Sequence, residues 1–225
     1  MINSQLLLIF LLAHFMGDFV LQTDKVAKLK VSSFNGLLLH VSIVTLTQAV
    51  FLSIYGLKGI VFALAAGVIH ILIDYSKIHL KKLFRKEFIL FLTDQIIHIL
   101  VIFGVVYMFG SNEGIRNIPI SNIQIKFVII FILLTYVTTI AIQIIIRDLY
   151  IINKPDFFYK NERVIDSIIS LCFFGCLLLT GFGWALLLVL YYIYIKFFGF
   201  YYSTAIIKTK FIILTAINLI VYLHN

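Results

Sequence analysis

The chain has 225 residues, of which 62% are hydrophobic and only 12% charged, and its formal net charge is +8. So few charges exclude a soluble globular domain of this length and indicate an integral membrane protein. The positive charge does not indicate a nucleic-acid partner, because the basic residues fall in short loops between apolar runs, where they act as topology signals.

The apolar runs are continuous rather than alternating, which favours helices over a β-barrel. A membrane-spanning helix needs about 20 mostly apolar residues. In chain order, the predicted helices cover residues 4–22, 34–54, 59–79, 88–109, 124–146, 164–180, 184–199 and 205–223. We therefore expect an all-α, polytopic membrane bundle of seven or eight helices. It forms a single domain over 1–225, with a four-helix half (1–110) and supporting helices (120–225).

The orientation of these helices follows from the Lys and Arg residues in the loops. With the N-terminus outside, fifteen of them lie on the inner side and three, Lys58, Arg116 and Lys126, on the outer side. Cytoplasmic loops are the ones enriched in Lys and Arg. The sequence therefore predicts an external N-terminus.

Ionisable side chains within the predicted helices are concentrated in the first four. Such groups are costly in a membrane, so each one indicates a function. They are His14 and Asp18 on the first helix, His40 on the second, His70 and Asp74 on the third, and Asp94 and His98 on the fourth. Six of the seven form pairs four residues apart, and this spacing places both members of a pair on one helix face.

The alternating directions of the four helices place all seven groups at a similar depth, near the inner surface, at a rise of 1.5 Å per residue. We therefore expect one shared site. Seven donors are too many for one tetrahedral ion and favour two divalent cations, with Zn preferred and Mn or Fe compatible. The carboxylates Asp18, Asp74 and Asp94 are also the catalytic candidates. A metal-free proton relay and structural hydrogen-bonded pairs remain as alternatives.

Several neighbours are expected to support this site. Gly17 would let two helices approach closely beside Asp18. Substrate-binding candidates are Gln22, Gln95, Arg147 and Arg163. The basic loops 25–30 and 77–86 are expected to flank its mouth and attract anions. Farther on, the aromatic residues between 191 and 202 predict an interfacial belt.

Four stretches carry a family resemblance: LLAHFMGDFVLQTDKVAK (11–28), LLLH (37–40), HILIDYSK (70–77) and DQIIH (94–98). Together they resemble a bacterial and phage membrane family catalogued as domain of unknown function 3307. The likeness covers roughly residues 5–105, and NERVIDSII (161–169) matches a later pattern loosely, without the Gly-rich phrase that usually precedes it. The resemblance implies a multi-pass protein of the bacterial inner membrane and brings no activity with it.

The chain is also distantly similar to inner-membrane proteins described as metal-dependent hydrolases, which supports a hydrolase by analogy. The preferred hypothesis is a membrane-embedded, divalent-metal-dependent hydrolase that acts on a phosphoester or lipid-like substrate at the cytoplasmic side. A divalent metal or proton transporter is the alternative, and a metal-stapled sensor or assembly subunit is the third. The expected partners are membrane lipid and an amphiphilic or phosphate-bearing small molecule.

Overall fold

The computed structural model describes residues 3–80, 86–109, 119–150, 162–178, 183–199 and 202–223. Every regular element in these ranges is a helix, as the sequence predicts. The chain divides into two compact units, Met1–Ile132 and Leu133–Asn225.

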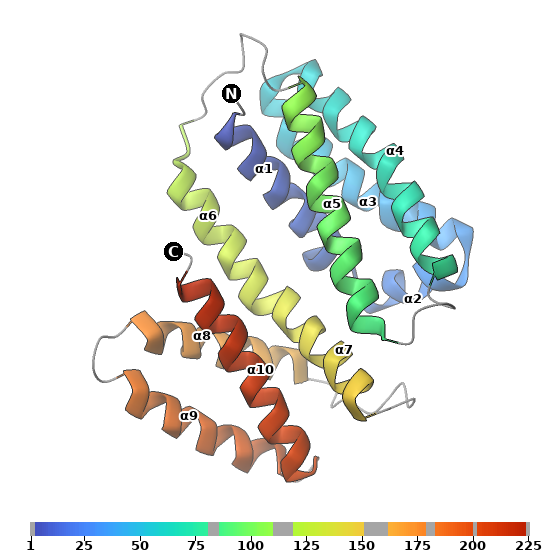
Figure 1. Cartoon of the computed structure of the whole chain (residues 1–225). Coiled ribbons are helices and arrows are strands. Elements are labelled where there is room, and N and C mark those ends of the chain that lie inside the picture. Colours follow the sequence, from blue (N-terminus) through green and yellow to red (C-terminus); the bar gives the residue numbers. More distant parts are fainter. Residues whose placement is uncertain are drawn as a thin grey trace. The chain divides into compact units, whose positions relative to one another are not determined.

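The first unit contains the four helices that carry the ionisable side chains (Figure 1). In chain order it consists of α1 (Ser4–Phe15), the π-helical turn η1 (Met16–Val20), α2 (Asp24–Ser32), α3 (Phe34–Leu52), the 3-10 turn η2 (Ser53–Tyr55), α4 (Leu57–Leu80), α5 (Glu87–Phe109) and α6 (Asn122–Ile132). Side-chain oxygens of Asn3, Thr23 and Ser33 accept backbone N–H groups at the starts of α1, α2 and α3. These caps explain why 24–32 forms a helix of its own, where the sequence predicted only a loop.

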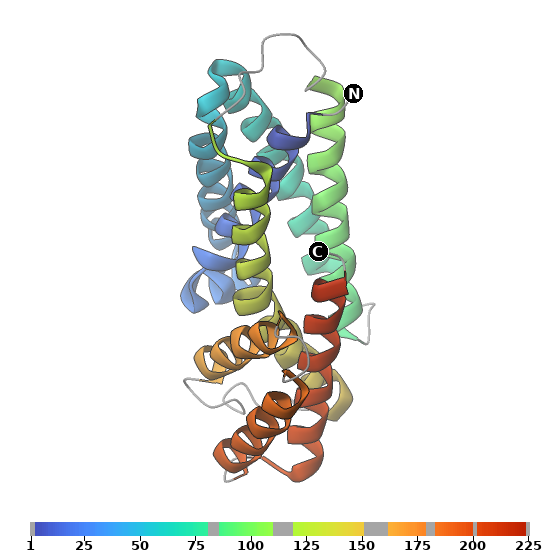
Figure 2. The ribbon, with the colours of Figure 1, turned by 90° about the vertical axis from the view of Figure 1, so that its left-hand side faces the viewer.

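Helix α1 lies at the centre of this unit and contacts α3, α5 and α6, while α4 packs between α3 and α5 (Figures 1 and 2). Its position buries Leu6, Phe10 and Ala13 completely. Helix α2 lies at the same end as the C-terminus of α4 and the start of α5 (Figure 1). The C-terminal end of α1 therefore points toward the end of the unit where α2, the C-terminus of α4 and the start of α5 lie.

Two glycines set the spacing of these helices. A Cβ atom added at Gly17 would lie 2.8 Å from Val44 Cα on α3, and one at Gly67 on α4 would lie 2.3 Å from Thr45 Oγ1. Both distances are too short for a real side chain. The prediction that Gly17 permits a close helix approach beside Asp18 is confirmed.

The second unit consists of the π-helical turn η3 (Leu133–Val137), α7 (Thr138–Tyr150), α8 (Glu162–Leu178), α9 (Gly183–Phe198) and α10 (Thr204–Leu223). Its core includes a fully buried ion pair between Lys210 Nζ and Asp166 Oδ2 at 3.2 Å. The Lys210 ammonium also lies over the rings of Tyr194, Phe198 and Tyr202. These three aromatic residues are buried, so the predicted interfacial belt is wrong for them.

Four helices in the described ranges are long and apolar enough to cross a membrane: Phe34–Tyr55, Leu57–Leu80, Glu87–Met108 and Asn122–Tyr150. A fifth candidate is Ser4–Val20 together with Asp24–Ser32, a pair bent by 88°. The prediction of seven or eight spans is therefore wrong. Helices α8 and α9 have 17 and 16 residues, fewer than the ~20 needed to cross a bilayer. Helix α10 carries two lysines and is not among the candidates.

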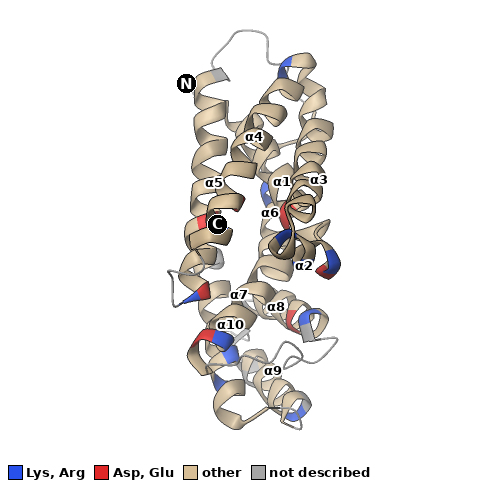
Figure 3. Ribbon diagram, turned by 90° about the vertical axis from the view of Figure 1, so that its right-hand side faces the viewer, with Lys and Arg blue, Asp and Glu red and all other residues tan. Residues whose placement is uncertain are grey.

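The outward faces of the candidate spans are apolar. Leu57 is 78% exposed, Met108 70% and Ile123 79%. Charged residues are few along the helices of the first unit (Figure 3). Exposed apolar surface of this extent suits contact with lipid rather than water.

Replacing Gly17 by alanine should lower the free energy of unfolding by about 1–3 kcal/mol, the usual cost of overpacking, because the new methyl group meets the α3 backbone. Thermal unfolding of the detergent-purified protein measures this effect. Gly104→Ala on α5 is a matched control, since a Cβ there meets no described atom within 4 Å. Equal melting temperatures for the two variants would contradict the close contact.

Candidate metal centre

The first pair of predicted donors lies where α1 passes into η1. The Leu21 N–H donates to the Met16 carbonyl at 2.9 Å, a bond across five residues that widens the turn. His14 Nε2 and Asp18 Oδ2 are consequently 4.0 Å apart. Such π turns frequently mark functional sites. The wider turn directs Asp18 toward α3 and α5.

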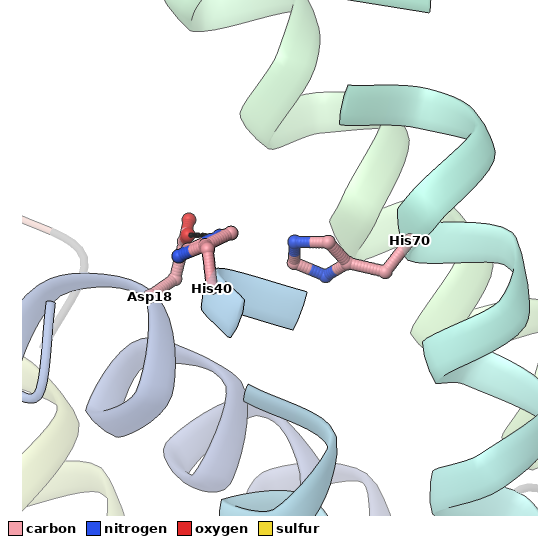
Figure 4. A group of neighbouring side chains, drawn as sticks. All are labelled: Asp18, His40 and His70. Atoms are coloured by element: carbon pink, nitrogen blue, oxygen red, sulfur yellow. Dashed lines mark ion pairs between the residues drawn. The ribbon is translucent and has the colours of Figure 1, made fainter. Parts of the chain in front are cut away.

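His40 on α3 lies between two carboxylates. Its Nε2 atom is 3.1 Å from Asp18 Oδ1 and 3.4 Å from Asp74 Oδ2, and His70 Nε2 is 3.1 Å from the same Asp74 oxygen. Figure 4 shows His40 against Asp18 and, across from this pair, the His70 ring directed toward it from another helix. Bonds of about 2.1 Å to a tetrahedral metal would place neighbouring donors about 3.4 Å apart. The three observed distances match the edges of such a site.

Helix α5 contributes the remaining pair. His98 Nδ1 is 2.8 Å from the Asp94 carbonyl, which can only accept, so Nδ1 carries the proton. In the neutral ring, Nε2 then holds a free lone pair, the usual arrangement of a histidine ligand. The His98 ring lies 4.1 Å from that of His70 and stacks on that of His14 at 5.2 Å. The structure thus brings all seven side chains into one cluster.

All seven groups are buried, none more than 6% exposed. Several of their atoms make no hydrogen bond, among them Nε2 of His14 and His98, and Oδ1 of Asp94. Buried polar atoms are nearly always paired, so a group of unpaired ones indicates a place for an ion or water. Two sets of three, Asp18–His40–His70 and His70–Asp74–His98, have donor atoms within 4.8 Å of one another. The residues present therefore fit a divalent cation.

Gln95 connects two of the carboxylates. Its Nε2 donates to Asp18 Oδ2 at 3.1 Å and to Asp94 Oδ2 at 3.2 Å. A bridging amide of this kind holds both carboxylates in place. Gln22, just after η1, is half-buried.

Two lysines from the predicted anion-attracting loops join the cluster instead. Lys30 Nζ on α2 lies 2.8 Å from Asp74 Oδ2 and 3.0 Å from His40 Nε2, and its side chain is 12% exposed. Lys77 Nζ donates to Asp94 Oδ2 at 2.5 Å. The Thr23 cap before the segment 24–32 is a sequence signal that could have revealed the start of α2.

The formal charges of the cluster nearly balance. Three carboxylates face two ammonium groups, which leaves a net charge of −1 while the histidines are neutral. His40 Nε2 nevertheless meets a conflict. If it carries a proton it faces the Lys30 ammonium, and if it does not it faces two carboxylate oxygens. A bound cation that displaces the ammonium would remove this conflict.

The predicted substrate residues Arg147 and Arg163 belong to the second unit. Arg163 Nε donates to Gln143 Oε1 at 3.1 Å. Part of the basic segment 77–86, residues 81–85, lies outside the described ranges. The substrate roles of these residues remain predictions.

The fold and the cluster define a class: helical proteins with a candidate metal centre inside apolar, membrane-length helices. A family model described as "Protein of unknown function (DUF3307)" matches residues 6–123, just over half of the chain, and the chain belongs to this family. All seven predicted donors and both lysines lie within the matched segment. No curated protein and no solved structure was found to be similar to the chain.

We expect the purified protein to hold about two equivalents of a transition metal, as dinuclear bundle sites do. Asp18→Asn combined with Asp74→Asn should remove most of it, because both substitutions replace anionic donors. Elemental analysis measures the content, and circular dichroism checks that the helices persist. Asp24→Asn, which neutralises an exposed carboxylate of α2, is the control and should retain the metal. A double variant with the metal content of the wild type would contradict the assignment of Asp18 and Asp74 as metal donors.

Proposed function

We propose that the protein is a multi-pass bacterial inner-membrane hydrolase that uses divalent metal to cleave a phosphoester in a lipid-like substrate at the cytoplasmic side. One observation carries this proposal: the buried donor cluster adjoins a cleft. The cleft has a volume of about 250 Å³, lies between α4 and α5, and is lined by Asp94 and Lys77. A substrate in it would meet a carboxylate of the cluster directly.

The membrane location is supported by four apolar helices of spanning length and by their exposed apolar faces. The cluster lies in the half of α4 and α5 nearest to α2 (Figure 1). The excess of Lys and Arg predicts that this end faces the cytoplasm. The substrate would then enter at the level of the lipid head groups on that side.

The donors divide into two groups, each with one lysine. The first group is Asp18, His40, His70 and Asp74, with Lys30 beside it, and the second is His14, Asp94 and His98, with Lys77 beside it. The two sets of donor atoms that lie within 4.8 Å of one another, Asp18–His40–His70 and His70–Asp74–His98, share His70 and include donors from both groups. Imidazole and carboxylate donors suit Zn best, and Mn or Fe remain compatible. A divalent cation in this position supplies Lewis-acid stabilisation of a phosphoryl group's charge.

The charges favour an anionic substrate. Two divalent cations in place of the two ammonium groups would change the formal charge of the cluster from −1 to +1. A buried positive charge requires compensation, which a phosphate group provides. The Lys77 ammonium, at the edge of the cleft, would hold the phosphate. Asp94 would accept the proton of the water that attacks phosphorus, or return it to the alcohol oxygen that leaves. Gln95 would keep Asp94 and Asp18 oriented.

A transporter would need a polar route to the opposite face. The outer part of the first unit is instead filled by apolar side chains, including Leu6, Phe10, Phe62 and Val106. Thr47 and Gln48 on α3 are buried polar exceptions. The cluster adjoins a cleft beside α5, and the outer part of the unit is largely apolar. Both features favour hydrolysis over transport.

Asp94→Asn should lower kcat by about 10²–10⁴-fold, the typical contribution of a general acid or base. The assay follows p-nitrophenol release from an alkyl p-nitrophenyl phosphate by metal-loaded protein in detergent. Asp24→Asn should leave the rate unchanged. Metal-loaded protein that hydrolyses no ester, but carries the ion across a liposome membrane, would contradict the hydrolase and establish the transporter.

The orientation can be tested with single cysteines in a Cys172→Ser/Cys176→Ser background. Lys58 and Lys28 are both exposed and lie at opposite ends of the first unit's helices. A membrane-impermeant maleimide should label Lys58→Cys in intact cells, and label Lys28→Cys only after the membrane is broken. The reverse pattern would place the cluster near the outer face.

A further inference from the structure

The cleft between α4 and α5 has a layered lining. The two helices run antiparallel, so that residues along α4 face residues along α5 in reverse order. Leu80 and Leu90 line the end near the helix termini. Ser76 and Lys77 face Thr93 and Asp94 in the middle, and Leu72 and Ile97 line the deeper end. The cleft is therefore polar at one level and apolar above and below it.

The apolar side chains at the deeper end of this cleft are exposed on the outer surface of the two helices. Leu72 is 61% exposed and Ile97 39%, on faces of spanning helices that would contact lipid. The deeper end thus continues into the hydrocarbon region of a membrane. An acyl chain could lie against it without leaving the bilayer, because its other side would remain among lipid chains.

The polar level offers one accessible cation. Lys77 is 26% exposed, whereas its partner Asp94 is 3% exposed. The ammonium therefore presents part of its surface to the cleft while its carboxylate partner faces the cluster. An anionic group that enters the cleft would meet Lys77 first, and the Ser76 and Thr93 side chains lie at the same level.

We propose that this cleft binds a membrane lipid with an anionic phosphate head group, with the phosphate on Lys77 and one acyl chain along Leu72 and Ile97. The volume of about 250 Å³ is below the ~300–1,000 Å³ of pockets that enclose whole drug-sized ligands. It fits a head group and the upper part of one chain. Lipid binding in the cleft does not depend on the proposed function. Only the further statement that this lipid is the substrate rests on it.

The test uses dodecylphosphonate, which carries a phosphate-like anion on one chain and has no ester bond to hydrolyse. A photoactivatable analogue, with a diazirine near the end of the chain, should crosslink to α4 and α5 near Leu72 and Ile97. Unlabelled dodecylphosphonate should compete for this crosslinking, and dodecanol and inorganic phosphate should not.

Thr93→Trp should weaken dodecylphosphonate binding by about tenfold or more, because the indole would fill the cleft. Thr93 is not a metal donor, so elemental analysis should find the metal unchanged. Leu100→Trp is the matched control, since Leu100 is 62% exposed on the same helix and does not line the cleft. Lys77→Gln should also weaken phosphonate binding, because it removes the cation that the phosphonate would meet.

Wild-type affinity in Thr93→Trp, or crosslinks distributed over all helices, would overturn the lipid site. Competition by inorganic phosphate as effective as that by dodecylphosphonate would overturn the role of the chain. Binding with the expected pattern in a protein that hydrolyses no ester would uphold the lipid site and remove the hydrolase. The two proposals can therefore fail separately.

Discussion

The burial of three carboxylates among apolar helices is the constraint on which the first unit depends. Removing an ionised group from water costs several kcal/mol unless it is paired and hydrogen-bonded. Histidine rings, the Gln95 amide and two ammonium groups contact Asp18, Asp74 and Asp94 and meet part of this requirement, while Oδ1 of Asp94 makes no hydrogen bond. Other features of the unit depend on it. Helix α2 bends by 88° from the preceding helix, which brings Lys30 to Asp74, and Gly17 lets η1 approach α3 so that Asp18 reaches His40.

The sequence was sufficient to predict that the seven polar groups lie together. Helical rise and alternating direction fix the depth of each side chain. Because an isolated buried ionisable group is costly, such groups are expected to lie together. The contacts of Lys30 and Lys77 could not be predicted in this way, because they depend on tertiary packing. A lysine beside a helix end has the same local pattern whether it faces water or a buried carboxylate. The number of spans was overestimated because hydropathy windows ignore where helices end, as in α8 and α9.

Both units contain a lysine paired with a buried aspartate, and the surroundings of the two kinds of pair differ. In the second unit, Lys210 meets Asp166 beneath three aromatic rings, and Tyr194 donates to the other oxygen of Asp166. The Lys210 ammonium and the Tyr194 hydroxyl each contact one oxygen of this carboxylate, and the pair suits a structural role. In the first unit, Lys30 and Lys77 pair with carboxylates beside ring nitrogens that make no hydrogen bond. Such an arrangement suits ammonium groups that a bound metal cation displaces.

The π turn at Met16–Val20 has a consequence for how this family can vary. A turn closed across five residues holds one more residue than the α-helical turn it replaces. Removing one residue there would restore regular winding and rotate α1 by about 100° relative to the helices after the turn. His14 would then turn away from its present contacts with the rings of His70 and His98. The cluster therefore depends more on the number of residues in this turn than on the side chains around it. Deleting one residue there would leave an ordinary helical bundle without the cluster.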